Sequence, residues 1–172
     1  LYRHSVYHLC RSDETVRVSK RQLQNKNEIM EKGEIRILFI DSHLLARKAI
    51  RDILSQDKRF QIIGECLEDD ESIESVRKLN PDIVLLNIDM TMIYGMNAIG
   101  QILADNPLAQ IIAVSMRNTP ADANKIMELG AKGYVTKTSD IKEFVTAIVE
   151  VENGNRYICS EASTQNNLPD IV

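Results

Sequence analysis

Five polar side chains of this 172-residue sequence comprise an acid, two hydroxyls, an amide and an ammonium. Together they are suited to bind a phosphoryl group and a divalent cation. A lysine ammonium pairs with phosphate oxygens, and a carboxylate is a common ligand of Mg²⁺. Each of the five lies at or just after the end of a short, mostly apolar run: Asp41, Ser42, Asn87, Ser115 and Lys137. They act together only if those runs end at one place in the fold.

The apolar run at residues 83–86 has no polar face. Such a run is typical of a strand buried on both sides in a parallel sheet covered by helices. We expect further strands at 35–40, 60–66, 110–115 and 133–137, and amphipathic helices at 43–54, 70–79, 96–104, 120–130 and 139–154. This alternation predicts an α/β fold, a doubly wound five-stranded parallel sheet of the flavodoxin-like type with helices on both faces. Parallel strands would bring the five polar residues to one edge.

Three segments are expected along the chain. Residues 1–33 read as an N-terminal extension or linker, helical in part, and residues 34–155 as the folded domain. Residues 156–172 read as a C-terminal tail, in which residues 160–163 favour the start of one more helix. The sequence therefore predicts one domain with two appendages.

Composition excludes some classes of protein. A net charge of −4 and a pI of about 5.4 argue against a chain that coats nucleic acid by charge alone. The sequence has no apolar run long enough to span a bilayer, so we expect no membrane association and a cytoplasmic location. Cys10, Cys66 and Cys159 lack paired spacing and are expected to be free thiols, with a redox role as the alternative.

Four motifs together resemble the receiver domain of two-component response regulators, CheY-like and closest to the NarL/FixJ type. They are ILFIDSH at 37–43, PDIVLLNIDM at 81–90, AVSM at 113–116 and GAKGYVTK at 130–137. The resemblance covers residues 34–155 and implies a receiver fold. The sequence after residue 154 is similar to the point where such regulators pass into a linker before a DNA-binding domain, which these residues do not include.

The resemblance assigns roles to individual residues. Asp41 matches one of the two acids that hold Mg²⁺ in the family. Ser115 and Lys137 match the hydroxyl and the ammonium that bind phosphoryl oxygens, and Tyr134 matches the aromatic residue that moves with them. Without a phosphoryl group, Lys137 is expected to pair with Asp41, and Tyr134 is either a two-position switch or a fixed core residue.

The same motifs also depart from the family at the acceptor. Asn87 stands where the family has the phosphoaccepting Asp, Ser42 replaces the second acid, and Thr91 replaces a common Pro. A carboxamide is a poor nucleophile and cannot form an acyl phosphate. With Asp41, Asn87 and a backbone carbonyl near Asp89 as the remaining oxygen ligands, we expect Mg²⁺ to bind weakly or not at all.

An atypical receiver without catalytic residues, signalling by protein contacts or dimerisation, is the resulting functional hypothesis. Alternatives are phosphorylation at another residue such as Asp89 or Ser115, an altered form of a working receiver, and a redox or small-molecule sensor. Expected partners are a second copy through helix faces, a histidine kinase or other regulatory protein, and DNA only through a further domain. The last helix supplies surplus apolar residues for a partner: Ile141, Phe144, Val145, Ile148 and Val151.

Overall fold

The computed structural model of this chain describes residues 33–67, 70–89 and 92–163. The chain divides into two units, Leu1–Glu34 and Ile35–Val172, and the elements below belong to the second. In chain order they are β1 (Ile35–Ile40), α2 (Leu44–Leu54), β2 (Phe60–Cys66), α3 (Asp70–Leu79), β3 (Ile83–Asn87), α4 (Met92–Asp105), β4 (Ile111–Ser115), α5 (Pro120–Glu128), β5 (Gly133–Thr136), α6 (Ile141–Glu152), β6 (Tyr157–Ile158) and α7 (Ser160–Ser163). None of these helices has both the length and the apolar character needed to cross a bilayer.

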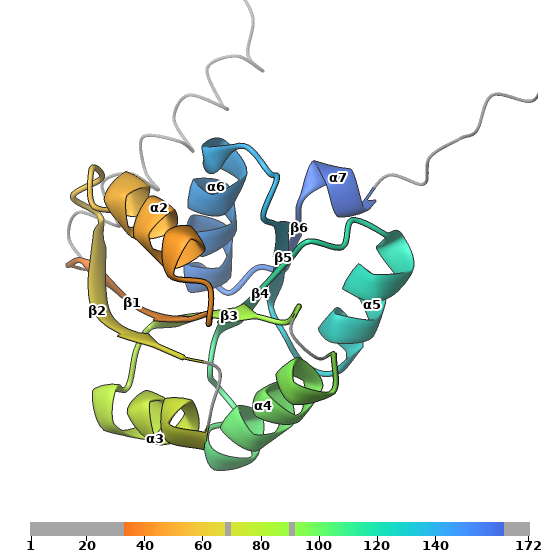
Figure 1. Ribbon diagram of the computed structural model, residues 1–172, viewed down its shortest axis with the longest axis horizontal. Helices are drawn as coiled ribbons and strands as arrows, with labels where there is room; N and C mark the ends of the chain where they lie inside the picture. The colour runs from red at the N-terminus through yellow and green to blue at the C-terminus, as the bar shows by residue number, and fades with distance from the viewer. Residues whose placement is uncertain (1–32, 68–69, 90–91, 164–172) are drawn as a thin grey trace, which may run out of the picture. The chain divides into compact units, whose positions relative to one another are not determined.

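The strands form one parallel sheet in the order β2-β1-β3-β4-β5-β6. Helices α2 and α6 cover one face, and α3, α4 and α5 cover the other (Figure 1). The predicted doubly wound α/β fold is therefore confirmed, but the prediction of five strands was one short. The sixth strand, β6, has two residues, Tyr157 and Ile158, which pair with Gly133 and Tyr134. Two residues are too few to show an alternating pattern.

Strand β3 lies at the centre of the sheet, and all five of its residues are buried. Its apolar run packs between helices on both faces, as its lack of a polar face predicted. Just beyond it, α4 approaches so closely at Gly95 that an added Cβ would lie 2.7 Å from Cγ2 of Ile88. Glycine is thus required by the contact. Helix α4 begins at Met92, earlier than the predicted start at residue 96.

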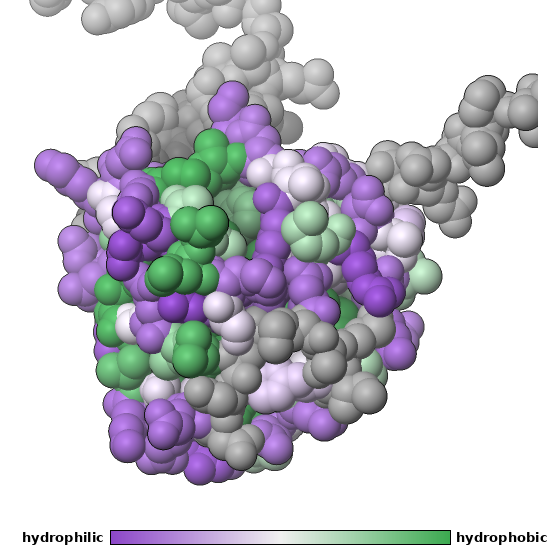
Figure 2. Space-filling view, viewed as in Figure 1, coloured by the Kyte–Doolittle hydropathy of each residue, from purple (hydrophilic) through white to green (hydrophobic). Residues whose placement is uncertain are grey.

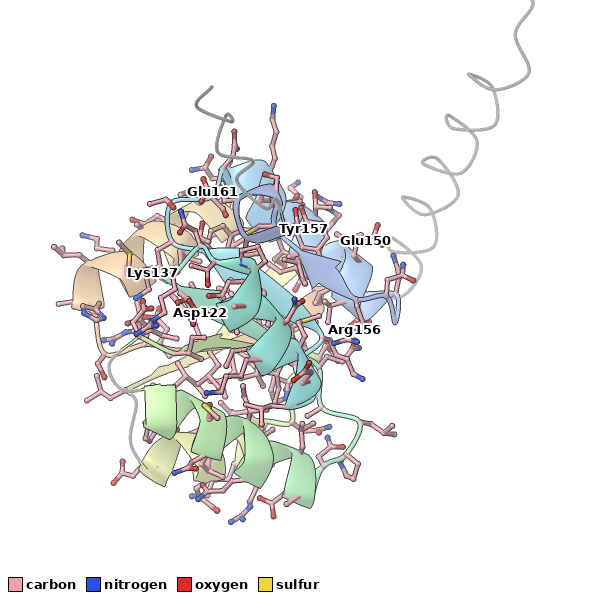
Figure 3. All side chains as sticks on the ribbon, turned by 90° about the vertical axis from the view of Figure 1, so that its right-hand side faces the viewer. Asp122, Lys137, Glu150, Arg156, Tyr157 and Glu161 are labelled. Carbon is pink, nitrogen blue, oxygen red and sulfur yellow. The ribbon has the colours of Figure 1, made fainter. Side chains whose placement is uncertain are left out.

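Residues 157–163, in the segment expected to be a C-terminal tail, pack on the sheet. The Tyr157 hydroxyl donates to Oε2 of Glu143 at 2.9 Å, and burial, followed by this hydrogen bond, raises the pKa of Tyr157 to about 12. The Glu161 carboxylate accepts hydrogen bonds from Thr136 and Thr138, which lower its pKa. Figure 3 shows Tyr157 and Glu161 from the side on which β6 and α7 lie. The segment after α6 is therefore tied to the end of β5.

The apolar residues of α6 are used by the core of the domain. Phe144, Ile148 and Val151 are buried, while Ile141 and Val145 are partly buried and pack against the same core. The core therefore uses most of the apolar residues predicted for a partner, and Ile141 and Val145 remain partly exposed. Exposed apolar side chains are found instead on α2, where Leu44 is 66 % and Leu45 is 82 % exposed. Figure 2 shows hydrophobic residues gathered over α2.

Candidate functional site

The five polar residues meet at one edge of the sheet, as the sequence predicted. Strand pairing aligns Ile40 with Leu86, Asn87 with Val114, and Ser115 with Thr136, so the carboxyl ends of β1, β3, β4 and β5 are level. Asn87 and Ser115 are the last residues of their strands, Asp41 and Lys137 directly follow theirs, and Ser42 comes next after Asp41. The topology thus builds a polar pocket from residues far apart in sequence.

Lys137 lies between two carboxylates in this pocket. Its Nζ is 3.0 Å from Oδ2 of Asp41 and 3.3 Å from Oδ2 of Asp89. The side chains are 12 %, 0 % and 15 % exposed for Lys137, Asp41 and Asp89. Neither Oδ2 atom meets hydrogen-bond geometry with a protein donor, so the contacts act through charge. The ion pair with Asp41 was predicted, whereas the one with Asp89 was not.

Asp89, which the sequence placed in the acidic pocket, contributes its side chain there. Its Oδ1 accepts hydrogen bonds from Oγ of Ser115 at 2.8 Å and from the backbone N–H of Met116 at 2.7 Å. The signal for this was the spacing of two residues from Asn87, because side chains two apart on an extended chain point the same way. Ser115 therefore bonds Asp89, and its Oγ also accepts from the N–H of Arg117 at 3.0 Å.

Asn87 and Ser42 occupy the positions at which the sequence departs from the family. Asn87 is fully buried, and its Oδ1 accepts a long 3.4 Å hydrogen bond from the N–H of Asp89. Ser42 is half-buried in the turn between β1 and α2. The pocket therefore holds a neutral carboxamide at the end of β3 and a single carboxylate, that of Asp41, at the end of β1.

Tyr134 is a buried residue in this structure. Its ring is fully buried, and its hydroxyl donates to the carbonyl oxygen of Arg117 at 2.8 Å. Burial raises the pKa of Tyr134 above its ordinary value. The ring therefore sits inside the domain, joined to the loop between β4 and α5. The backbone acceptor on Arg117 had no signal in the sequence.

Asp41 has further contacts that sequence reasoning missed. Its Oδ1 accepts from the backbone N–H of His43 at 2.7 Å and lies 2.9 Å from Nδ1 of the same residue. The Arg47 guanidinium donates to the carbonyl oxygen of Asp41 and lies 3.5 Å from Oε2 of Glu65. Asp41 is therefore fixed by the first turn of α2 as well as by Lys137.

The described cysteines lie far apart. Cys66 ends β2 and is half-buried, while Cys159 follows β6 and is fully buried. Strands β2 and β6 form opposite edges of the sheet, and neighbouring strands are about 4.8 Å apart. These two thiols therefore cannot pair within this fold. Cys10 lies outside the described residues.

Comparison with known proteins points to one family. The response regulator receiver domain matches residues 37–149. The response regulator GacA of Pseudomonas viridiflava is 33% identical, over 76% of this chain and 61% of its own length. The response regulator UvrY of Escherichia coli is 32% identical, over 80% of this chain and 63% of its own length. A two-component response regulator of the LuxR family from Aurantimonas has 30% identity and a TM-score of 0.69 over 73% of this chain and 89% of that one. This chain spans less than two thirds of these two curated relatives.

Proposed function

Because the chain belongs to the response regulator receiver domain family, we propose that it is an atypical receiver of a LuxR/NarL-type regulator. In this proposal it accepts no phosphoryl group at residue 87 and signals through protein contacts. The observation that carries the proposal is the buried carboxamide of Asn87 at the end of β3, where the family has its acceptor carboxylate. A carboxamide at that position cannot form the acyl phosphate that switches a working receiver.

The proposal extends to the metal that the family uses. The Lys137 ammonium lies within 3.3 Å of Oδ2 of both Asp41 and Asp89, so a positive charge already stands between the two carboxylates. Among residues 33–67, 70–89 and 92–163, no three His, Cys, Asp or Glu side chains cluster as metal ligands do. Because Mg²⁺ prefers carboxylate and water oxygens in octahedral order, we propose that it binds here weakly or not at all.

The partners follow from the relatives and belong to the same proposal. DegU of Brevibacillus brevis is named a transcriptional regulatory protein, and this chain covers 56% of it. We infer that the receiver acts on DNA only through a further domain, and that it exchanges signals with a histidine kinase or another regulatory protein. Self-association through helix faces is the proposed output, and light scattering after gel filtration tests it. A strict monomer at high protein concentration would contradict a homodimer.

Phosphorylation is tested by intact-protein mass after incubation with acetyl phosphate and Mg²⁺. Three proteins are compared: the wild type, Asn87→Asp, and Ser42→Asp/Asn87→Asp, with far-UV circular dichroism confirming that each is folded. We expect no mass gain for the wild type and the greatest gain for the double variant, because it restores both the acceptor and the second acid. A matched incubation with EDTA distinguishes metal-dependent transfer from nonspecific acylation.

A mass gain of one phosphoryl group on the wild type would overturn the proposal. Peptide mapping then identifies the modified residue. Phosphate on Asp89 or Ser115 would support the alternative in which another residue of the pocket accepts it. If neither variant gains a phosphoryl group while both stay folded, the pocket has lost more than its acceptor, and signalling by contacts alone is supported.

A further inference from the structure

We propose that the space between α3 and α4 is a binding site for an α-amino acid with an apolar side chain. The two helices lie side by side over one face of the sheet (Figure 1) and border a cavity of about 220 Å³. This cavity is at the amino-terminal edge of the sheet, at the other end of β3 from Asn87. It adds a small-molecule input that does not depend on whether residue 87 accepts a phosphoryl group.

The interior of the cavity is apolar. Its wall is formed by buried side chains from both helices, from β3 and from the segment before β4: Ile73, Val76, Val84, Ile102 and Ala109. Atoms that line such a cavity lack dispersion contacts on one side, so an apolar group that fills the space is stabilising. A cavity of about 150 Å³ is enough to bind benzene. This larger one therefore accepts a side chain with one ring or a branched aliphatic chain.

Two side-chain contacts join α3 to α4. Close to the helix starts, Oγ of Ser72, which is fully buried, is 3.0 Å from the hydroxyl oxygen of Tyr94. Close to the helix ends, Nη2 of Arg77 is 2.6 Å from Oδ2 of Asp105. These contacts fix the spacing of the two helices and therefore the width of the cavity between them.

The rim of the cavity carries one positive and one negative side chain, those of Arg77 and Asp105. The last turn of α3 contains two basic residues, Arg77 and Lys78, whereas α4 has no basic residue in its last turn and ends in Asp105. A helix C-terminus carries partial negative charge, so an ammonium is favoured at the end of α4. A carboxylate is favoured beside the guanidinium of Arg77. The rim is therefore complementary to the two charges of an α-amino acid.

Opening the pair between Arg77 and Asp105 for a ligand costs little. The two side chains are 54 % and 37 % exposed, and ion pairs in such places contribute little to stability. The ligand replaces this one pair with two, from its ammonium to Asp105 and from its carboxylate to Arg77. Its side chain also leaves water for the apolar interior. Because such a ligand has few atoms, we expect affinity in the millimolar range.

Titration of the wild-type protein with phenylalanine, followed by the backbone amide NMR signals of Asn80, Asn106 and Ala109, tests the inference. These three residues line the cavity. We expect saturable shifts with a Kd of about 1 mM, and none up to about 20 mM glycine, which has the same charges but no side chain. Hydrocinnamate lacks the ammonium and phenethylamine lacks the carboxylate. Each should therefore bind about tenfold more weakly than phenylalanine.

Variants of the rim and of the wall assign the two parts of the ligand. Arg77→Gln and Asp105→Asn should each weaken phenylalanine binding about tenfold, because each removes one charged partner. Lys78→Gln is the matched control, since Lys78 follows Arg77 on α3 and pairs with Glu74 but does not line the cavity. Its affinity should equal that of the wild type. Ala109→Leu should abolish binding by filling the interior, and the rim variants decide the question if it does not fold.

A folded wild-type protein with no saturable phenylalanine shift would overturn the inference. Hydrocinnamate or phenethylamine binding as tightly as phenylalanine would show that the rim does not recognise both charges, and an amino acid would then be the wrong class of ligand. Equal losses for Lys78→Gln and Arg77→Gln would contradict the assigned rim in the same way. No phosphodonor is present in these titrations, so their outcome is separate from that of the mass experiment on residue 87.

Discussion

Lys137→Met should destabilise the domain strongly, because it removes the ammonium that lies between Asp41 and Asp89. Asp41 is fully buried and Asp89 is 15 % exposed, so both carboxylates would lose their counter-charge in a largely desolvated place. Breaking a buried pair by removing one partner costs roughly 3–5 kcal/mol. Both acids keep hydrogen bonds to Oδ1, from His43 and from Ser115, so we expect the lower end of this range, about 3 kcal/mol. That is a large share of a typical free energy of unfolding of roughly 5–15 kcal/mol.

Urea unfolding followed by far-UV circular dichroism measures the change. Lys132→Met is the matched control, because Lys132 is exposed in the turn before β5 and its loss should change the free energy by no more than about 0.5 kcal/mol. Lys137→Met/Asp89→Asn should recover part of the stability, since it removes one of the two carboxylates left without a counter-charge. A Lys137→Met protein as stable as the Lys132→Met control would refute the charge-based account of the pocket.

Three further predictions concern the parts that frame the pocket. The pKa of Tyr157 is raised from its ordinary 10.0 to about 12, so its neutral hydroxyl contributes stability that is complete below pH 10 and is lost as the pH rises through 12. The free energy of unfolding of Tyr157→Phe should therefore lack this loss between pH 10 and pH 12. A pH dependence of unfolding equal to that of the wild type would contradict the prediction. Gly133→Ala should lower the free energy of unfolding by about 1–3 kcal/mol, because the added Cβ would lie 2.9 Å from Cγ1 of Ile112 and 3.2 Å from Cγ2 of Val151. A urea midpoint equal to that of the wild type would show that the neighbouring side chains move aside without cost. Ile148→Ala should lower the free energy of unfolding by about 2–5 kcal/mol, whereas Leu45→Ala on the exposed face of α2 should change it by only about 0.5 kcal/mol. Equal losses in thermal unfolding would mean that these two side chains are wrongly assigned to core and surface.

The sequence predicted those features that depend on long, regular patterns. The run ending at Asn87 was assigned to a strand buried on both sides, and all five residues of β3 are buried. Because parallel strands end at one edge, the meeting of Asp41 and Lys137 also followed from the order of elements alone. Periodicity and topology therefore carried the prediction as far as the place of the pocket.

Features that depend on short segments or on side-chain orientation were missed. Strand β6 is only two residues long, and its pairing depends on neighbours such as Gly133 that are distant in sequence. The side chain of Asp89 lies two residues after Asn87, but its donors, Ser115 at the end of β4 and Met116 just after it, are distant in sequence. The hydroxyl of Tyr134 donates to the backbone carbonyl of Arg117, an acceptor that every residue carries, so residue types do not predict this contact. Such contacts arise only from the tertiary structure.

The position of the Asp89 carboxylate in the pocket is tested most directly by a crystal structure of the protein grown with acetyl phosphate and Mg²⁺. We expect Oδ1 of Asp89 to lie within hydrogen-bond distance of Ser115 and Met116, and Lys137 to lie beside Oδ2. We also expect that Asn87 carries no phosphoryl group. An Asp89 side chain turned out to solvent, with Mg²⁺ or a phosphate group bound among these donors in the wild-type protein, would contradict it.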